Sequence, residues 1–261
     1  MKPIFMGHYL FNRTYKKDVA DKLSTNDVIK EDILSAEDIE HLPIIVQNYL
    51  KYVGAIGKPK IHNVYIVSEG QMRAKGKAYF PFTSEQYNFF KEPTRLFFMN
   101  AKIKGLVIPG YHKYSNRKAK MDIRLFGLIK IVNPKPGVLD KAETVTFFND
   151  MCLLAPAALI DSRIQWEEVD AFTIKAIFTN DPITVSAILY FNDEGQLINF
   201  ESEDRLDVNE MKQYKFSTPV STYKNFDGYQ LISCGDMIWH HPDGAFKYGQ
   251  IRIKHVVYNV K

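Results

Sequence analysis

Two adjacent histidines are the first candidates for metal chemistry in this sequence. His240 and His241 directly precede Pro242-Asp243-Gly244, a run that is typical of a hairpin turn. Neighbouring residues of a strand point to opposite faces, so one ion cannot easily bind both side chains. The same hairpin would place His255 opposite Leu231, about 30 Å from His240. We therefore interpret the histidines as polar residues that flank a turn, and we expect no metal and no cofactor.

The motifs of several enzyme classes do not occur in the sequence. It has no Gly-x-x-x-x-Gly-Lys-Ser/Thr or Gly-x-Gly-x-x-Gly loop for phosphates and no Gly-x-Ser-x-Gly nucleophile elbow. Carboxylates occur as adjacent pairs such as Glu167-Glu168 and Asp193-Glu194. Adjacent strand residues face opposite sides, so these pairs do not form an acid–base dyad. The sequence therefore leaves open whether the protein is an enzyme.

Four side chains are our candidates for contact with a ligand: Gln86, Asp150, Arg205 and Trp239. Asp150 lies in an apolar helical stretch, where a carboxylate is either at the rim or buried and paired. Our leading hypothesis is a non-enzymatic protein that binds an apolar or amphipathic small molecule or a lipid at these residues. The alternative is an enzyme of unknown class in which Asp150 acts with Arg205 or Gln86. That alternative requires Asp150 to line a cavity within hydrogen-bond reach of another polar side chain.

Composition narrows the class of protein. The chain has 261 residues, of which 46% are hydrophobic and 25% charged, and this balance excludes intrinsic disorder. Its net charge of +4 and pI near 8.8 fall short of the basic character of nucleic-acid-binding proteins, so we expect no nucleic acid partner. The basic run 112–120 is interpreted as a solvated loop or hairpin.

Cysteine content and apolar runs bear on the compartment. Cys152 and Cys234 are interpreted as buried thiols in a reducing environment, which favours the cytoplasm. The longest apolar run, residues 151–160, has ten residues, whereas a membrane span needs about 20. We therefore expect no transmembrane segment. The oligomeric state is not predictable from these features.

Helical periodicity marks the N-terminal part of the chain. Phe11, Tyr15, Val19 and Leu23 recur at every fourth residue and predict an amphipathic helix over about 12–23. We expect this helix to pack against its own domain, with Tyr15, Val19 and Leu23 mostly buried, and the chain to be free of membranes. Ser35 and Asp38 indicate a cap, and a further helix is expected between Pro43 and Gly54.

Alternating patterns predict strands over most of the remaining chain. We divide the sequence into N-terminal helices (1–57), a first set of strands (60–132), inserted helices (138–160) and a second set of strands (164–259). Short turns between the strands require antiparallel pairing. The predicted fold is a single α+β domain over 1–261. It has one large, curved, half-barrel-like antiparallel sheet of about ten strands, and helices pack on the concave face. An apolar trough is expected between the two layers.

Several segments together resemble an uncharacterised bacterial family, a domain of unknown function. They are Leu42-Pro43-Ile44-Ile45-Val46-Gln47-Asn48-Tyr49-Leu50 with Gly57-Lys58-Pro59, Phe80-Pro81-Phe82-Thr83-Ser84-Glu85-Gln86, the strand 93–101, the helical segment 150–159, Trp166-Glu167-Glu168 with Asp170, Phe191-Asn192-Asp193-Glu194-Gly195, Arg205, and the end from Trp239 to Tyr258. The resemblance covers nearly the whole chain and implies no catalytic residues.

The sequence departs from this family at a few points. Relatives tend to have a tryptophan after Pro219, where this chain has Val220, and many begin with a membrane-spanning helix that this chain lacks. At the level of fold, a curved sheet closed by helices is similar to the half-barrels of bacterial lipoprotein carriers, which hold acyl chains. The resemblance therefore implies a fold and an apolar ligand, and no reaction.

Overall fold

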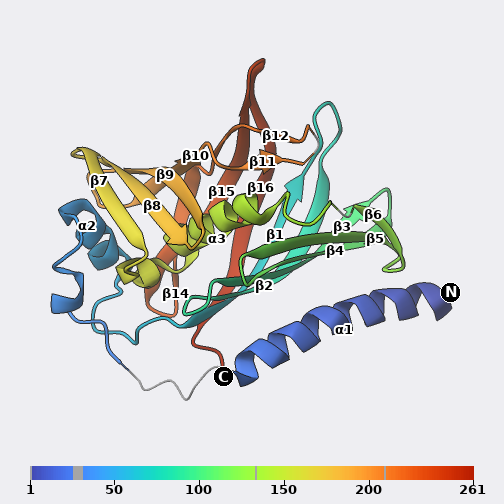
Figure 1. Ribbon diagram of the computed structural model, residues 1–261, viewed down its shortest axis with the longest axis horizontal. Helices are drawn as coiled ribbons and strands as arrows, with labels where there is room; N and C mark the ends of the chain where they lie inside the picture. Colours follow the sequence, from blue (N-terminus) through green and yellow to red (C-terminus); the bar gives the residue numbers. More distant parts are fainter. Residues whose placement is uncertain (1, 26–31, 133, 209) are drawn as a thin grey trace. The chain divides into compact units, whose positions relative to one another are not determined.

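The chain is seen in a computed structural model that describes residues 2–25, 32–132, 134–208 and 210–261, with only the backbone for residues 2–5 (Figure 1). Contacts divide it into two compact units. Unit 1 comprises Met1–Ile29, His62–Asp140 and Ile253–Lys261, and unit 2 comprises Lys30–Ile61 and Lys141–Arg252. Each unit therefore combines segments that are distant in the sequence.

Unit 1 consists of a long helix, α1 (Lys2–Ser24), and a meander of antiparallel strands. The strands are β1 (Asn63–Met72), β2 (Phe80–Phe89), β3 (Thr94–Ile103), β4 (Leu106–Ser115), β5 (Lys118–Leu125) and β6 (Ile129–Val132). The end of β16 (Gly244–Tyr258) completes the sheet beside β1. There the backbone N–H groups of Asn259 and Val260 both donate to Asn63, to its carbonyl oxygen and its side-chain oxygen.

The basic run of the sequence forms the β4–β5 hairpin, as predicted. Asn116 and Arg117 make its two-residue turn, and both have positive φ angles of 52° and 61°. This conformation matches the right-handed twist of the flanking strands, and asparagine adopts it more readily than most residues do.

Helix α1 packs along β3 and β4 through its apolar stripe. Phe11, Tyr15 and Val19 are buried against Phe98 and Tyr111. The Tyr15 ring stacks on Phe98 with 5.3 Å between centroids and meets Tyr111 edge-on at 5.5 Å. The predicted burial of Tyr15 and Val19 is confirmed, and Leu23, in the last turn, is partly buried.

Unit 2 begins with two short helices whose ends follow the predicted signals. Ser35 and Asp38 are bonded reciprocally at the start of η1 (Glu37–Ile39), since the backbone N–H of each donates to the side chain of the other. Pro43 precedes α2 (Ile44–Val53), and Gly54 ends it in the left-handed conformation with φ of 73°.

The inserted helical segment is α3 (Asp140–Leu154) followed by η2 (Pro156–Ile160). Phe147 and Phe148 of α3 are fully buried, and both pack on Phe178. Phe148 also meets Phe200 edge-on at 5.9 Å. These aromatic rings form the core between α3 and the strands of unit 2.

The sheet of unit 2 runs in the order β16-β15-β13-β10-β9-β8-β7, with all neighbours antiparallel. Its strands are β7 (Ile164–Asp170), β8 (Thr173–Asn180), β9 (Ile183–Phe191), β10 (Leu197–Ser202), β13 (Lys215–Ser217) and β15 (Tyr229–His241). A further strand, β14 (Val220–Phe226), pairs with β15, and β11 (Leu206–Asp207) and β12 (Lys212–Gln213) form a separate hairpin.

The predicted α+β class and antiparallel pairing are confirmed, but the number of strands is higher than expected. Fourteen strands belong to one hydrogen-bonded sheet, where about ten were predicted. Turns within continuous runs of strand-forming residues account for part of the difference. Lys104 and Gly105, both with positive φ, separate β3 from β4. Pro219, which has no N–H to donate to a neighbouring strand, separates β13 from β14.

The two cysteines are free thiols, and their burial differs from the prediction. Cys152 on α3 is fully buried, as expected. Cys234 on β15 is only half-buried, and it lies between Thr222 of β14 and Arg252 of β16. None of the helices in the described part of the chain is long and apolar enough to cross a bilayer.

Candidate functional site

A pocket opens in unit 2 where two strands diverge. β13 and β14 follow each other along the same edge of β15, separated by Thr218 and Pro219. β10 pairs with β13 only at Glu201↔Ser217 and Ser202↔Phe216, and its earlier residues have no partner on β14. The strands thus separate on the far side of Pro219, whose carbonyl oxygen accepts a hydrogen bond from the Asp236 N–H at 2.9 Å.

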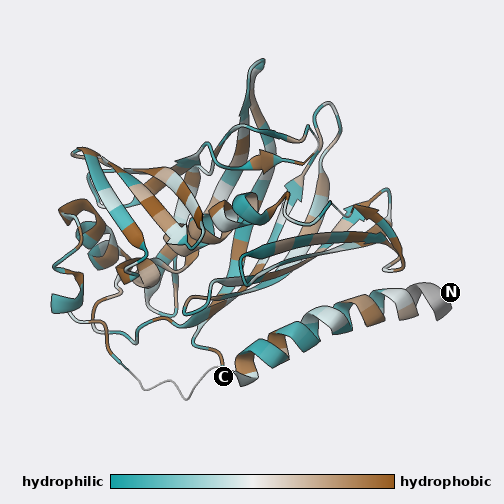
Figure 2. Ribbon diagram, in the orientation of Figure 1, coloured by the Kyte–Doolittle hydropathy of each residue, from teal (hydrophilic) through white to brown (hydrophobic). Residues whose placement is uncertain are grey.

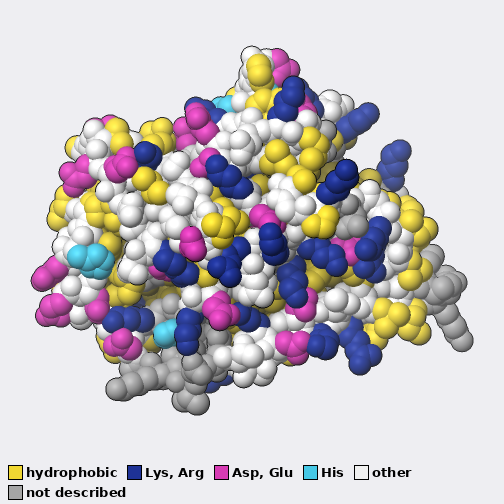
Figure 3. Space-filling view, in the orientation of Figure 1, with side chains coloured by type: hydrophobic (Ala, Val, Ile, Leu, Met, Phe, Trp, Pro, Cys, Tyr) yellow, Lys and Arg dark blue, Asp and Glu magenta, His cyan; other side chains and the backbone are white. Residues whose placement is uncertain are grey.

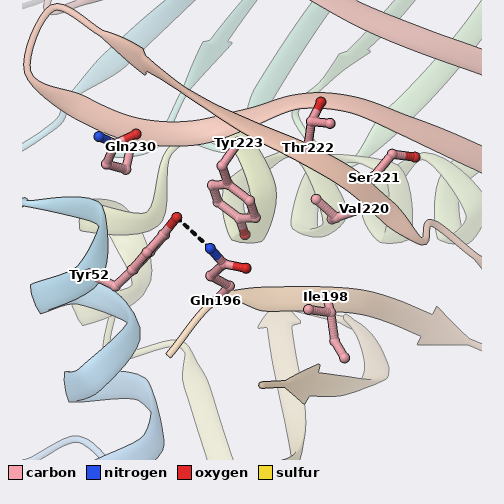
Figure 4. A pocket seen from close by; sticks show the side chains of 8 residues that line it. All are labelled: Tyr52, Gln196, Ile198, Val220, Ser221, Thr222, Tyr223 and Gln230. Carbon is pink, nitrogen blue, oxygen red and sulfur yellow. Dashed lines mark hydrogen bonds between the residues drawn. The ribbon is translucent and has the colours of Figure 1, made fainter. Parts of the chain in front are cut away.

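The space between the diverging strands is a pocket of about 470 Å³, which we call the β10–β14 pocket (Figure 4). It falls within the range of roughly 300–1,000 Å³ that is common for small-molecule sites. Its lining residues come from α2, from the start of β10, and from β14 and β15: Tyr52, Gln196, Ile198, Val220, Ser221, Thr222, Tyr223 and Gln230.

Two tyrosines and a glutamine form the inner wall of this pocket. The rings of Tyr52 and Tyr223 meet edge-on with 5.4 Å between centroids. Gln196 donates a hydrogen bond from Nε2 to the Tyr52 hydroxyl at 2.7 Å (Figure 4). The Tyr223 hydroxyl donates to the carbonyl oxygen of Leu197 at 2.8 Å. These contacts hold the side chains in place before any ligand arrives.

The β10–β14 pocket carries no formal charge. None of its eight lining residues is acidic or basic, and burial raises the pKa of Tyr223, so that its hydroxyl stays protonated. Amide and hydroxyl groups of Gln196, Gln230 and Ser221 supply donors and acceptors, while Ile198 and Val220 supply apolar surface. The pocket is therefore suited to a neutral molecule with both polar and apolar parts.

A second pocket, of about 400 Å³, lies on the other side of Tyr52. It is bounded by α2, the β7–β8 turn and the β9–β10 turn, and it includes the charged side chains of Lys51, Asp193 and Glu194. Gly195 approaches α2 so closely that a Cβ atom on it would lie 3.3 Å from the carbonyl oxygen of Asn48. This close approach explains why a glycine ends that turn.

Arg205 and Trp239, two of the predicted site residues, lie together. The Arg205 guanidinium stacks on Phe216 at 3.9 Å and lies 5.3 Å from the centre of a Trp239 ring. It also donates a hydrogen bond to the Tyr248 hydroxyl at 3.1 Å. Neither residue lines the β10–β14 pocket or the second pocket, and the contacts are those of a packed cation–aromatic cluster.

Asp150 and Gln86 are likewise not among the residues that line the two pockets. Asp150 is half-buried on α3, and its charge, together with burial, raises the pKa of Cys152. Gln86 lies in unit 1 on β2, where it is buried between Asn88 and Arg95 at 3.0 and 3.1 Å. The role of these four residues in ligand contact stays a prediction.

The apolar trough expected between helix and sheet is filled where α3 meets its strands. Phe147, Phe148, Phe178 and Phe200 occupy this interface, and each is fully buried. The aromatic side chains fill this space by packing on one another. The β10–β14 pocket lies elsewhere, between strand edges.

The two adjacent histidines point in opposite directions, as predicted. His240 makes a hydrogen bond to the Ser217 hydroxyl at 2.8 Å. His241 is buried and contacts Asp207 on the β11–β12 hairpin through Nε2 at 3.2 Å. Asp207, Glu210 and His241 are the group among the described residues whose ligand atoms lie close enough to hold a metal ion, within 4.8 Å of one another.

This cluster was not predicted from the sequence. Its spacing Asp-x-x-Glu lies in a short hairpin, and only the fold brings it to His241. Each carboxylate has a hydrogen-bonding partner, because His241 pairs with Asp207 and the Tyr214 hydroxyl donates to Glu210 at 2.6 Å. The other ring nitrogen of His241, Nδ1, is buried without a hydrogen-bond partner among the described residues.

Comparison of the sequence with known families gives one assignment. Residues 32–251 match the family of unknown function DUF6544. The chain belongs to this family. The resemblance found in the sequence is thereby confirmed, and most of both units lies within the matched range. No curated protein matches the chain.

Two solved structures resemble this member of the DUF6544 family in fold. One is described as an outer membrane lipoprotein-sorting protein domain from Vibrio parahaemolyticus, with a TM-score of 0.46, 10% identity, and coverage of 83% of this chain and 92% of that chain. The other is a LolA superfamily protein from Nitrosomonas europaea, with a TM-score of 0.47, 9% identity, and coverage of 83% and 94%. Both likenesses concern the fold alone.

Proposed function

We propose that this protein binds a small, neutral, amphipathic molecule in the β10–β14 pocket. The observation that carries the proposal is the pocket itself: it has the volume of a ligand site, a preformed wall of two tyrosines, and no charged group. Preformed side chains lower the entropic cost of binding, because they need not be immobilised by the ligand.

The chemistry of the lining defines the ligand class. The edge-on rings of Tyr52 and Tyr223 offer a surface for a flat or aliphatic body, and the amides of Gln196 and Gln230 offer hydrogen bonds to its polar end. An ionised ligand would lose its hydration without meeting an opposite charge, so the pocket favours neutral molecules.

An enzymatic role finds no support in this pocket. The Thr222 hydroxyl is hydrogen-bonded to the Ser233 hydroxyl at 2.7 Å, and the lining contains no histidine, carboxylate or lysine that would activate a nucleophile. The alternative that Asp150 acts in catalysis required it to line a cavity, and it lines neither of the two pockets. We therefore favour binding over catalysis.

The proposal is tested with Nile red, a neutral amphipathic dye whose fluorescence rises in apolar surroundings. The native protein should bind it saturably with one site in the pocket. The substitution Val220→Trp places a bulky ring in the pocket and should weaken this binding at least tenfold. Lys224→Trp, on the exposed part of the same strand, is the matched control and should leave the affinity unchanged.

Thermal unfolding of both variants shows whether they fold like the native protein. If folded Val220→Trp protein bound the dye as tightly as the native protein, the pocket would not be the ligand site. Native mass spectrometry of the purified protein, with and without Val220→Trp, then identifies any molecule retained from the cell by its mass.

A further inference from the structure

Unit 1 has a surface on which several large apolar side chains are exposed. It comprises the outward face at the start of α1 and the β5–β6 hairpin, and its residues are Met6, Tyr9, Leu10, Leu128, Ile129 and Ile131. Each has between 49% and 62% of its surface exposed. We call this set the α1–β6 surface. Isolated exposed apolar residues are ordinary, but a group of six on two elements that touch each other is typical of an interaction site.

The two parts of the α1–β6 surface touch at two glycines. A Cβ atom on Gly7 would lie 2.4 Å from Cγ of Leu128 and 2.6 Å from the carbonyl oxygen of Phe126. A Cβ atom on Gly127 would lie 2.5 Å from the carbonyl carbon of Gly7. The backbone of α1 at Gly7 therefore lies directly against Gly127 and the Leu128 side chain of the hairpin. Figure 2 shows the apolar β5–β6 turn beside the first turns of α1.

Helix α1 has two apolar faces with different roles. The inner face carries Phe11 and Tyr15, which are buried in the core of unit 1. Met6, Tyr9 and Leu10 are spaced at i, i+3 and i+4, so they lie together on the opposite, outer face. The expectation from the sequence of a helix without lipid contact rested on the narrow inner stripe and on the negative charges of Asp18 and Asp21, and it did not consider the outer face.

Basic residues predominate around the α1–β6 surface. Residues 1–17 and 123–139 contain seven Lys and Arg residues and no Asp or Glu. The acidic residues that adjoin these ranges, Asp18, Asp122 and Asp140, pair with Lys113, Arg124 and Lys118. Arg124 pairs with Asp122, but among the described residues Arg13, Lys16 and Lys130 form no ion pair. In this region hydrophobic side chains adjoin those of Lys and Arg (Figure 3).

The combination of exposed apolar and basic side chains favours an anionic membrane over a second copy of the chain as the partner of this surface. Two copies of the chain joined by a twofold axis would bring the same basic residues face to face, which is repulsive. An anionic lipid surface takes both features at once, since apolar side chains enter the boundary of the acyl chains and basic ones contact the headgroups. We propose that the α1–β6 surface docks the protein on anionic membranes.

The test measures co-sedimentation with phosphatidylcholine vesicles that contain 30% phosphatidylserine, in 150 mM NaCl, against vesicles of phosphatidylcholine alone. Binding should be at least tenfold stronger to the anionic vesicles and should weaken in 500 mM NaCl. Leu10→Gln with Ile129→Gln should abolish it. Arg13→Gln with Lys130→Gln should weaken it about 25-fold, because each basic residue near the surface contributes about fivefold.

Matched controls come from unit 2. Val169→Gln with Met211→Gln removes two equally exposed apolar side chains, and Lys212→Gln with Lys224→Gln removes two exposed charges. Neither pair should change vesicle binding, and thermal unfolding verifies the fold of each variant. Equal binding to both vesicle types, or loss of binding in the controls, would overturn the proposal.

Size-exclusion chromatography addresses the competing occupant. A self-associating protein that becomes monomeric on Leu10→Gln with Ile129→Gln, without binding anionic vesicles, would show that a second copy covers the surface and would also overturn the proposal. The pocket-filling variant Val220→Trp should bind vesicles normally, so this outcome is independent of the ligand proposed above.

Discussion

Two tyrosines that touch in the core of unit 1 should respond to the same substitution with opposite signs. Tyr15 and Tyr111 meet edge-on at 5.5 Å, and both are buried. The Tyr111 hydroxyl donates a hydrogen bond to the Asp18 carboxylate at 2.8 Å. The Tyr15 hydroxyl has no hydrogen-bond partner among the residues that the structure describes. Removing the Tyr111 hydroxyl therefore removes a hydrogen bond, whereas removing the Tyr15 hydroxyl removes the cost of burying a polar group without a partner.

The magnitudes follow from these contacts. Burying a hydroxyl without a partner costs about 1–3 kcal/mol, so Tyr15→Phe should raise the free energy of unfolding by about 1 kcal/mol, allowing for relaxation. A hydrogen bond to a charged acceptor contributes about 1.5–3 kcal/mol. Tyr111→Phe should lower the free energy of unfolding by about 1.5 kcal/mol. This value is at the low end of that range, because the Asp18 carboxylate keeps its ion pair with Lys113 at 2.9 Å in the variant.

Urea unfolding at pH 7, followed by circular dichroism, measures both changes. Burial raises the pKa of each phenol, so both hydroxyls are neutral there and ionisation does not enter the comparison. Equal dependence of the unfolding free energy on urea in all three proteins is the control for an unchanged unfolded state. The reasoning fails if Tyr15→Phe destabilises the protein as much as Tyr111→Phe does.

Two further predictions concern single side chains. Burial and the nearby charge of Lys215 lower the pKa of His240, so the folded state takes up a proton less readily than the unfolded state. Stability should therefore fall as the pH drops below about 6.5, the unfolded value, and His240→Gln should reduce this loss between pH 7.5 and 5 in urea titrations. An identical pH dependence in the variant would contradict this. The two thiols should differ in reactivity. Cys152 is buried and burial raises its pKa, whereas Cys234 is half-buried, so Ellman's reagent should label Cys234 quickly and Cys152 slowly. Cys234→Ser should remove that fast reaction, and a second fast thiol would show that the helix core opens.

Local patterns predicted most of the elements, because their causes are local. The spacing of Phe11, Tyr15 and Val19 predicted α1, and Pro43 and Gly54 marked the ends of α2. The two predicted sets of strands, 60–132 and 164–259, agree with β1–β6 and β7–β16 to within a few residues. Predictions were poorest where one run of strand-forming residues contains an inconspicuous turn, as at Lys104 and Gly105.

The pairing of distant segments was not predictable in the same way. The β10–β14 pocket exists because Glu201 pairs with Ser217 while the strands diverge beyond Pro219, and neither fact follows from neighbouring residues. A bulge between Met237 and Ile238 also shifts the β15–β16 register by one residue, which the hairpin alone does not reveal. The four predicted site residues were chosen by the chemistry of their side chains. That chemistry does not reveal where two strands diverge and leave a pocket between them.

The way the chain passes between the two units constrains its synthesis. Unit 1 draws its last segment, Ile253–Lys261, from beyond the whole of unit 2, and this segment holds β1 at Asn63 through two backbone N–H groups. When the ribosome reaches residue 253, all residues of unit 2 (30–61 and 141–252) have already been synthesised. Unit 2 is therefore complete before the last segment of unit 1 is made. The meander β1–β6 must therefore wait with the β1 edge unpaired during translation. An exposed strand edge of this kind readily pairs with other chains, which makes the interval before residues 253–261 emerge the period in which the nascent protein most needs protection by a chaperone.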